Sequence, residues 1–288
     1  MVNLPKAVSR LIATAIACSS VLAIASTATA ASLKITVENL APEGGTLLTP
    51  FWFGLHNGSF DLLNEGQALP IQPFERLVED GLTAPISNYF ASSGAGSVQG
   101  VVFGGLERPI APISPGAKAS AIVDIDNSIL STPYFSYAAM VIPSNDAFFA
   151  NDDPLEHRLF DARGNFIATS FDIFGSEVYD AGTEVNDETP INTAFLGQPA
   201  PNTGTTEGGV VSIHPGFRPA GTGGVLDAST TFRGRTINFV NADFKAPGYR
   251  VARITIERVP EPSTLAILPL TGLFLLYRKA RRSLSKAS

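Results

Sequence analysis

Cysteine is almost absent from this chain of 288 residues, and the only one, Cys18, lies in an apolar N-terminal stretch. The rest of the chain has no thiol for a disulfide or a cysteine metal site, so a domain there depends on its hydrophobic core. The sequence also lacks the His-Glu-x-x-His, Gly-x-Ser-x-Gly and Gly-Lys-Ser/Thr motifs. Histidine is scarce, and the three histidines form no pair at metal-ligand spacing. These absences argue against the common catalytic centres.

Basic residues are few in the central part of the chain. The net charge of −6 hides an uneven distribution, because residues 31–259 contain 13 basic and 25 acidic residues, a balance of −12. A domain of this charge repels the phosphates of nucleic acids, so we expect no nucleic-acid partner. Cations, or neutral and basic surfaces, are better matched to it.

Residues 1–30 have the organisation of a signal peptide. Lys6 and Arg10 precede an Ala-rich apolar stretch, which closes on the sequence Ala-Thr-Ala that ends at Ala30. Signal peptidase accepts this small-residue pattern, so we expect an N-terminal signal helix, cleavage after Ala30 and export of the remaining chain. A membrane-anchored or buried helix is the alternative, although the apolar run is short for a membrane span.

The last residues, 260–288, contain three elements in a fixed order. The sequence Pro-Glu-Pro at 260–262 is followed by an apolar run, residues 265–277, and then by a cluster of Lys and Arg. As a helix this run extends about 20 Å, less than the roughly 30 Å of a bilayer's hydrocarbon core. We predict a short C-terminal transmembrane helix whose basic end is cytoplasmic, with everything before it outside.

This order of elements resembles the PEP-CTERM sorting signal. The resemblance implies a partner, an integral-membrane exosortase that recognises and processes the tail, in addition to signal peptidase at the other end of the chain. A weak single-pass anchor is the alternative. Both interpretations put residues 31–259 at the cell surface or outside the cell, held to or processed at the cytoplasmic membrane.

Residues 31–259 are expected to form one all-β domain. Apolar and polar residues alternate at 33–38 and 251–258, which is typical of strands with one buried face. One helix is expected at 73–80, where proline opens it and glycine follows, and no second strong helical segment is visible. Further strands are expected at 51–56, 98–103, 119–125, 135–142 and 166–171, and a long loop at 186–224. The pattern predicts an antiparallel β-sandwich with one or two short helices.

Three acidic residues stand at the ends of expected strands. Asp146 follows the apolar strand 135–142, and Asp180 and Glu184 bracket a short loop whose glycine allows a sharp bend. Calcium takes about six to eight oxygen ligands, so three carboxylates would supply the charged part of a site, with Asn186 and Asp187 as further oxygen donors. The alternative is that these acidic loop residues are simply solvated.

The segments 135–146, 179–184 and 251–258, together with the opening strand, resemble the spondin domain in order and character. The resemblance implies an antiparallel β-sandwich that binds calcium, with Asp146, Asp180 and Glu184 as the metal ligands. Two positions depart from the family pattern, because Glu184 replaces an aspartate and Ala147 stands where an aromatic residue is usual. The cysteines of the animal domains are missing too, so their matrix and receptor interactions are not implied.

Together these features favour an exported, non-enzymatic binding or structural protein whose partner is the extracellular matrix or a surface polymer. One alternative is a secreted hydrolase that cleaves matrix polysaccharide with paired carboxylates, for which the chain offers Asp152, Asp153, Asp172 and Glu177. Another is a membrane-surface module in which calcium bridges the loops to anionic lipids. No cofactor other than calcium is expected.

Overall fold

The computed structural model describes residues 31–105, 111–125, 129 and 131–259. The predicted signal peptide and the predicted sorting tail, with its short transmembrane helix at 265–277, lie outside the described residues. Within the described ranges, no helix is both long and apolar enough to cross a membrane.

The described chain is built mainly from short strands. The helices are α1 (Gln72–Asp80) and α2 (Thr83–Ser93), with 3-10 turns at Gly175–Glu177, Pro190–Asn192 and Val225–Asp227. The strands are β1 (Ala31–Asn39), β2 (Leu47–Leu48), β3 (Phe51–His56), β4 (Val98–Val102), β5 (Lys118–Ile125), β6 (Tyr134–Ile142), β7 (Ala147–Ala150), β8 (Thr169–Phe174), β9 (Tyr179–Asp180), β10 (Ser212–Ile213), β11 (Ser229–Phe232), β12 (Arg235–Asn238) and β13 (Arg250–Val259).

The strands form two main sheets and a hairpin, and their pairings are antiparallel. One sheet has the order β5-β1-β13-β8, and the other has the order β10-β9-β7-β6-β3-β4, with β2 paired to β6. The strands β11 and β12 form a separate two-stranded hairpin. The prediction of an antiparallel, mostly β fold is therefore confirmed.

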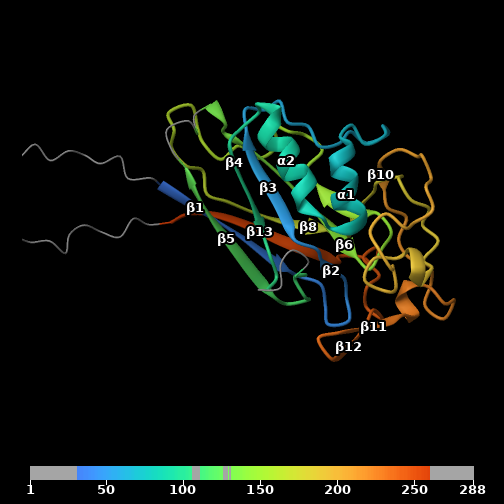
Figure 1. Cartoon of the computed structure of the whole chain (residues 1–288). Helices are drawn as coiled ribbons and strands as arrows, with labels where there is room; N and C mark the ends of the chain where they lie inside the picture. Colours follow the sequence, from blue (N-terminus) through green and yellow to red (C-terminus); the bar gives the residue numbers. More distant parts are fainter. Residues whose placement is uncertain (1–30, 106–110, 126–128, 130, 260–288) are drawn as a thin grey trace, which may run out of the picture.

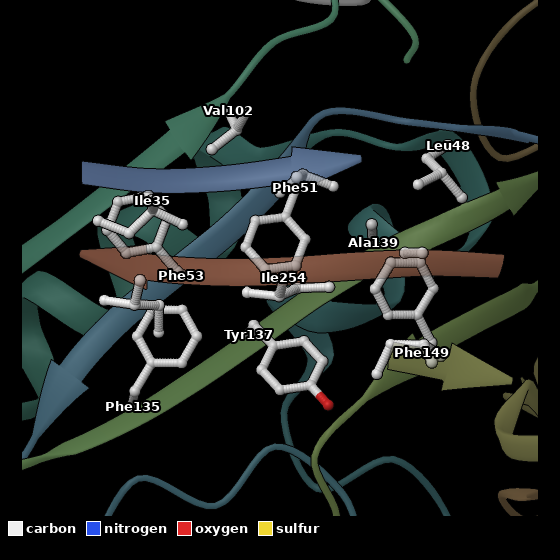
Figure 2. Packing of buried hydrophobic residues seen from close by; sticks show 14 of the residues in the cluster. Ile35, Leu48, Phe51, Phe53, Val102, Phe135, Tyr137, Ala139, Phe149 and Ile254 are labelled. Atoms are coloured by element: carbon white, nitrogen blue, oxygen red, sulfur yellow. The ribbon is translucent and has the colours of Figure 1, made fainter. Parts of the chain in front are cut away.

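The main core lies between the two sheets. Alternate residues of β1, such as Ile35, are fully buried against aromatic side chains of β3 and β6. Figure 2 shows Ile254 of β13 facing Phe51 and Tyr137, whose rings stack with centroids 5.7 Å apart. Burying a side chain of this size stabilises the fold by about 1.5–3 kcal/mol, which is how a domain without disulfides is held together.

The two helices cover the outer face of the larger sheet as a third layer (Figure 1). Trp52 points to this side of β3, where its ring meets Phe90 of α2 edge-on at 5.5 Å. From α1, Phe74 meets Phe148 of β7 in the same way at 5.4 Å. Because these large rings are fully buried, the helices form part of the folded core.

Most expected elements are present, and the structure adds the short strands β2 and β9 and the β11–β12 hairpin. The strand expected at 166–171 runs instead at Thr169–Phe174. The helix α2 was not expected, because its Ser and Asn residues are weak helix formers and its buried seam is only Thr83, Ile86 and Phe90. The four-residue strand β7 was also missed, since a fully buried run of this length has no alternation. The expected long loop is mainly irregular, with one 3-10 turn and β10.

Both ends of the described domain lie at the same end of the sandwich. Ser32 near the start of β1 pairs with Val259 at the end of β13. Beyond the far end of β1, the chain turns into β2, and Leu47 pairs with Ile142 at the end of β6. The turn after β6 is therefore at the end of the sandwich opposite the two termini (Figure 1).

Candidate metal centre

The turn after β6 and the strand β9 bring two predicted ligands together. Asp146 ends the turn, which is closed by Ser144, whose hydroxyl donates to the carbonyl of Val141 (2.6 Å) and accepts from the amide of Ala147 (3.2 Å). Asp180 is the last residue of β9 and pairs with Ala147 at the start of β7. Because β7 and β9 are neighbours, the two aspartates become adjacent although they are distant in sequence.

Asp146 holds the loop that follows β9. Its side chain is 0% exposed, and its Oδ2 accepts hydrogen bonds from the amide and hydroxyl of Thr183 (2.9 and 3.1 Å) and from the amide of Glu184 (3.1 Å). Its Oδ1 is buried and has no hydrogen-bond partner among the residues that the structure describes. One carboxylate oxygen therefore fixes the loop, and the other is left without a donor.

Asp180 belongs to a chain of polar contacts that ends at a buried histidine. Its Oδ1 accepts from the amide of Gly182 (2.8 Å), its Oδ2 accepts from the side-chain amide of Asn186, and its charge acts on the carboxyl of Asp146. The Oδ1 of Asn186 lies 3.2 Å from Nε2 of His214. Since Nδ1 of His214 accepts from a backbone amide, its Nε2 carries the hydrogen and donates to Asn186.

Glu184 lies beside the aspartates but is turned toward another loop. Its Oε1 accepts a hydrogen bond from the amide of Gly204 (2.9 Å). A Cβ atom at Gly204 would overlap the Glu184 carboxylate, so only glycine fits there without a shift. Its Oε2 is buried and, within the described part of the chain, has no hydrogen-bond partner.

Burial and neighbouring carboxylates make the charged forms of these groups costly. Burial, and then the charge of Asp180, raises the pKa of Asp146 to about 7. Burial, and then the charge of Glu79, raises the pKa of Glu184 to about 7. Burial also raises the pKa of Asp180. These shifts arise because each carboxylate is desolvated beside another, which is the situation that a bound cation relieves.

The donor chemistry fits a hard cation, and the side-chain positions fit it only in part. Every candidate ligand is an oxygen, and Asp146 and Glu184 each present one buried oxygen without a partner. However, no group of three or more His, Cys, Asp or Glu side chains is placed to hold one metal ion in the described residues. Glu184 would have to turn away from Gly204 to join the two aspartates. The three-ligand set stays a prediction.

The two further oxygen donors expected from the sequence are engaged elsewhere. Asn186 directs its oxygen to His214 and its amide nitrogen to Asp180. Asp187 accepts hydrogen bonds from the amide and hydroxyl of Thr189 and from the side chain of Asn192. As placed, neither supplies an oxygen to the aspartate pair.

Two residues of helix α1 belong to this region and were not expected from the sequence. Glu79 is buried, and its charge acts on Glu184. Arg76 pairs with Glu79 (3.1 Å) and with Asp80, and its side chain also bonds Asn202 (2.7 Å). In the sequence, Glu79 follows the apolar residues Leu77 and Val78 of a predicted helix, and this position does not reveal what the helix packs against.

Three of the four carboxylates proposed for a hydrolase are held by local hydrogen bonds or ion pairs. Asp172 lies on the outer face of β8 and is bound in a fork by Arg253 (2.6 and 2.9 Å). Glu177 accepts the amide of Phe174 (2.7 Å), and Asp153 accepts the amide of Leu155 (2.8 Å). These three carboxylates each have a local structural partner.

No protein-family model matches this chain, and no curated protein matches it in sequence. The resemblance to the spondin domain and to the PEP-CTERM signal stays a prediction from the chain's own residues.

Proposed function

We propose that this protein is an exported, non-enzymatic binding module of the cell surface or extracellular matrix, with a spondin-like β-sandwich whose distal loops are ordered by calcium. The observation that carries the metal part of this proposal is a pair of buried carboxylate oxygens, Asp146 Oδ1 and Glu184 Oε2, without partners among the described residues. Buried polar atoms are rarely left unpaired. A cation bound beside a buried carboxylate offsets the free-energy cost of removing its charge from water.

Calcium binds through Asp146 and Asp180, with Glu184 completing the charged ligands once its side chain turns from Gly204. The ion neutralises the charges of its carboxylate ligands and links two loops. It takes part in no catalytic step. Backbone carbonyls and water provide the remaining oxygens that calcium requires. The loop between Asp180 and Glu184 is already tied to Asp146 by three hydrogen bonds, so little reorganisation accompanies binding.

The positions of the two termini and of the carboxylate loops support display of the domain at a membrane. Both termini of the domain lie at one end of the sandwich, and the loops with the carboxylates lie at the other. Residues 1–30 direct export and are removed by signal peptidase. Residues 260–288 are recognised by an exosortase and hold the chain at the cytoplasmic membrane until they are processed. The domain then presents its distal loops away from the membrane, toward a matrix or surface polymer.

The metal part is tested by thermal melting of the purified full-length chain. We expect calcium to raise the melting temperature in a saturable manner, and magnesium to do so less, because magnesium demands a tighter octahedral site and keeps its waters. An unchanged melting temperature at millimolar calcium contradicts the metal site.

The export part is tested separately by intact-mass measurement of the protein recovered from cells. We expect a product that begins at residue 31 and has a processed C-terminal tail. A product that retains residues 1–30 contradicts export, whatever the result with calcium.

A further inference from the structure

A second site lies apart from the carboxylates, in a cleft that nothing above uses. The cleft has a volume of about 590 Å³ and is formed by the loop between β1 and β2, the turn at 114–116 and the β11–β12 hairpin. Its walls include Glu43, Leu47, Ser114 and Arg235. This volume is in the range of small-ligand sites, and the loop after β1 puts it at the end of the sandwich opposite the termini (Figure 1).

The hairpin brings two arginines to this cleft. Phe232 pairs with Arg235, so the connection is the two-residue loop Arg233-Gly234. Both loop residues have positive φ, 52° at Arg233 and 72° at Gly234. Asn-Gly or Gly-Gly is preferred in such a turn because a side chain strains this backbone. Arg233 thus occupies a backbone conformation in which the turn itself favours asparagine or glycine.

The two guanidinium groups differ in their surroundings. Arg235 is exposed, and its guanidinium makes no hydrogen bond or ion pair with residues that the structure describes, although it lines the cleft. The guanidinium of Arg233 lies over the ring of Phe232, 5.1 Å from its centroid. The cleft walls hold two arginines against one glutamate, Glu43, whereas residues 31–259 carry a balance of −12. This local positive balance favours an anionic ligand.

The other walls offer hydrogen-bonding groups and some apolar surface. Glu43, Ser114 and Asn238 line the cleft together with the apolar side chains of Leu47 and Phe232. On one side of the cleft the backbone of Gly44 lies close to the Asn238 side chain, because a Cβ atom at Gly44 would be 2.8 Å from the Asn238 oxygen. A ligand with several hydroxyl groups and one carboxylate matches this mixture.

We propose that this cleft binds a segment of an acidic polysaccharide, with a uronate carboxylate at Arg235. The planar guanidinium group matches a carboxylate through two parallel hydrogen bonds. Glu43 accepts hydrogens from sugar hydroxyls. This proposal names a polymer class for the surface role proposed above, but it does not depend on calcium.

The test uses the full-length chain and a fluorescent oligogalacturonate, with binding followed by anisotropy. The buffer contains EDTA, because calcium bridges uronates and because this condition separates the cleft from the metal centre. We expect saturable binding that Arg235→Glu weakens at least tenfold, since a charged hydrogen-bonding partner becomes repulsive. The control is Arg163→Glu, which changes another exposed arginine that precedes a glycine of positive φ and lies outside the cleft. The control should change the affinity less than twofold.

Three outcomes overturn the proposal. The first is an absence of saturable binding to oligogalacturonate by the wild-type chain. The second is equal binding to a neutral dextran or to poly-glutamate of similar length, which points to unspecific or peptide binding. The third is an equal loss of affinity in the Arg163 and Arg235 variants. Because Arg235 is exposed, its variants should melt as the wild type does, and Arg235→Gln provides a neutral second variant. A negative result with calcium leaves this test unaffected.

Discussion

Replacing Asp146 by asparagine separates a calcium ligand from a purely structural carboxylate. Asparagine keeps a side-chain oxygen that can accept the hydrogen bonds from Thr183 and Glu184, so the loop clamp can survive. The change removes the buried charge and one ligand of the proposed ion. In EDTA we therefore expect Asp146→Asn to be as stable as the wild type or more stable, because a desolvated charge beside Asp180 is lost.

With calcium the expected order is reversed. An ion at a hundred times its dissociation constant stabilises the folded state by about 2.7 kcal/mol. For a domain of this size, that corresponds to a rise in melting temperature of roughly 5–10 °C. The wild type should show this rise, and Asp146→Asn should show almost none.

The assay is thermal unfolding followed by circular dichroism, in EDTA and at several calcium concentrations. The matched control is Asp187→Asn, since this nearby aspartate is already engaged by Thr189 and Asn192. The control should keep the response to calcium. An Asp146→Asn variant with the full calcium response would refute the reasoning, and so would a variant that is strongly destabilised in EDTA.

Three further predictions concern stability. Burial lowers the pKa of His56 from 6.5 to about 4, so the unfolded chain takes up a proton first as the pH falls. The wild type should therefore lose up to about 3 kcal/mol relative to His56→Gln between pH 6.5 and 4, measured by urea unfolding, and a pH-independent difference contradicts this. Phe53→Ala empties a fully buried site and should cost about 3–5 kcal/mol in the same assay, while a cost below about 1 kcal/mol argues against the core described here. Gly204→Ala puts a methyl group where the Glu184 carboxylate lies, so this side chain must turn away and lose its hydrogen bond from the residue 204 amide. The cost should be about 1 kcal/mol by thermal melting, and a variant as stable as the wild type contradicts that contact.

The candidate site was recognisable from the sequence only in part. Asp146 and Asp180 follow apolar or turn-forming residues, and such local signals mark strand ends. Their contact depends on β7 and β9 being neighbours, and β7 has no alternation to reveal it. The approach of Glu79 and the orientation of Asn186 by His214 depend on packing between segments far apart in the chain. No spacing rule encodes contacts of this kind.

What the sequence by itself determined is the class of fold. Alternation at period two is a local property, because successive side chains of a strand point to opposite faces, so β1 and β13 are legible in the residues alone. Tertiary structure alone decided that β1 and β13 pair, that both termini leave one end of the sandwich, and that three separate segments enclose a cleft with two arginines. The physical reason is that burial and sheet pairing bring residues together according to the packing of the whole domain. The separation of two residues along the chain does not specify whether they meet.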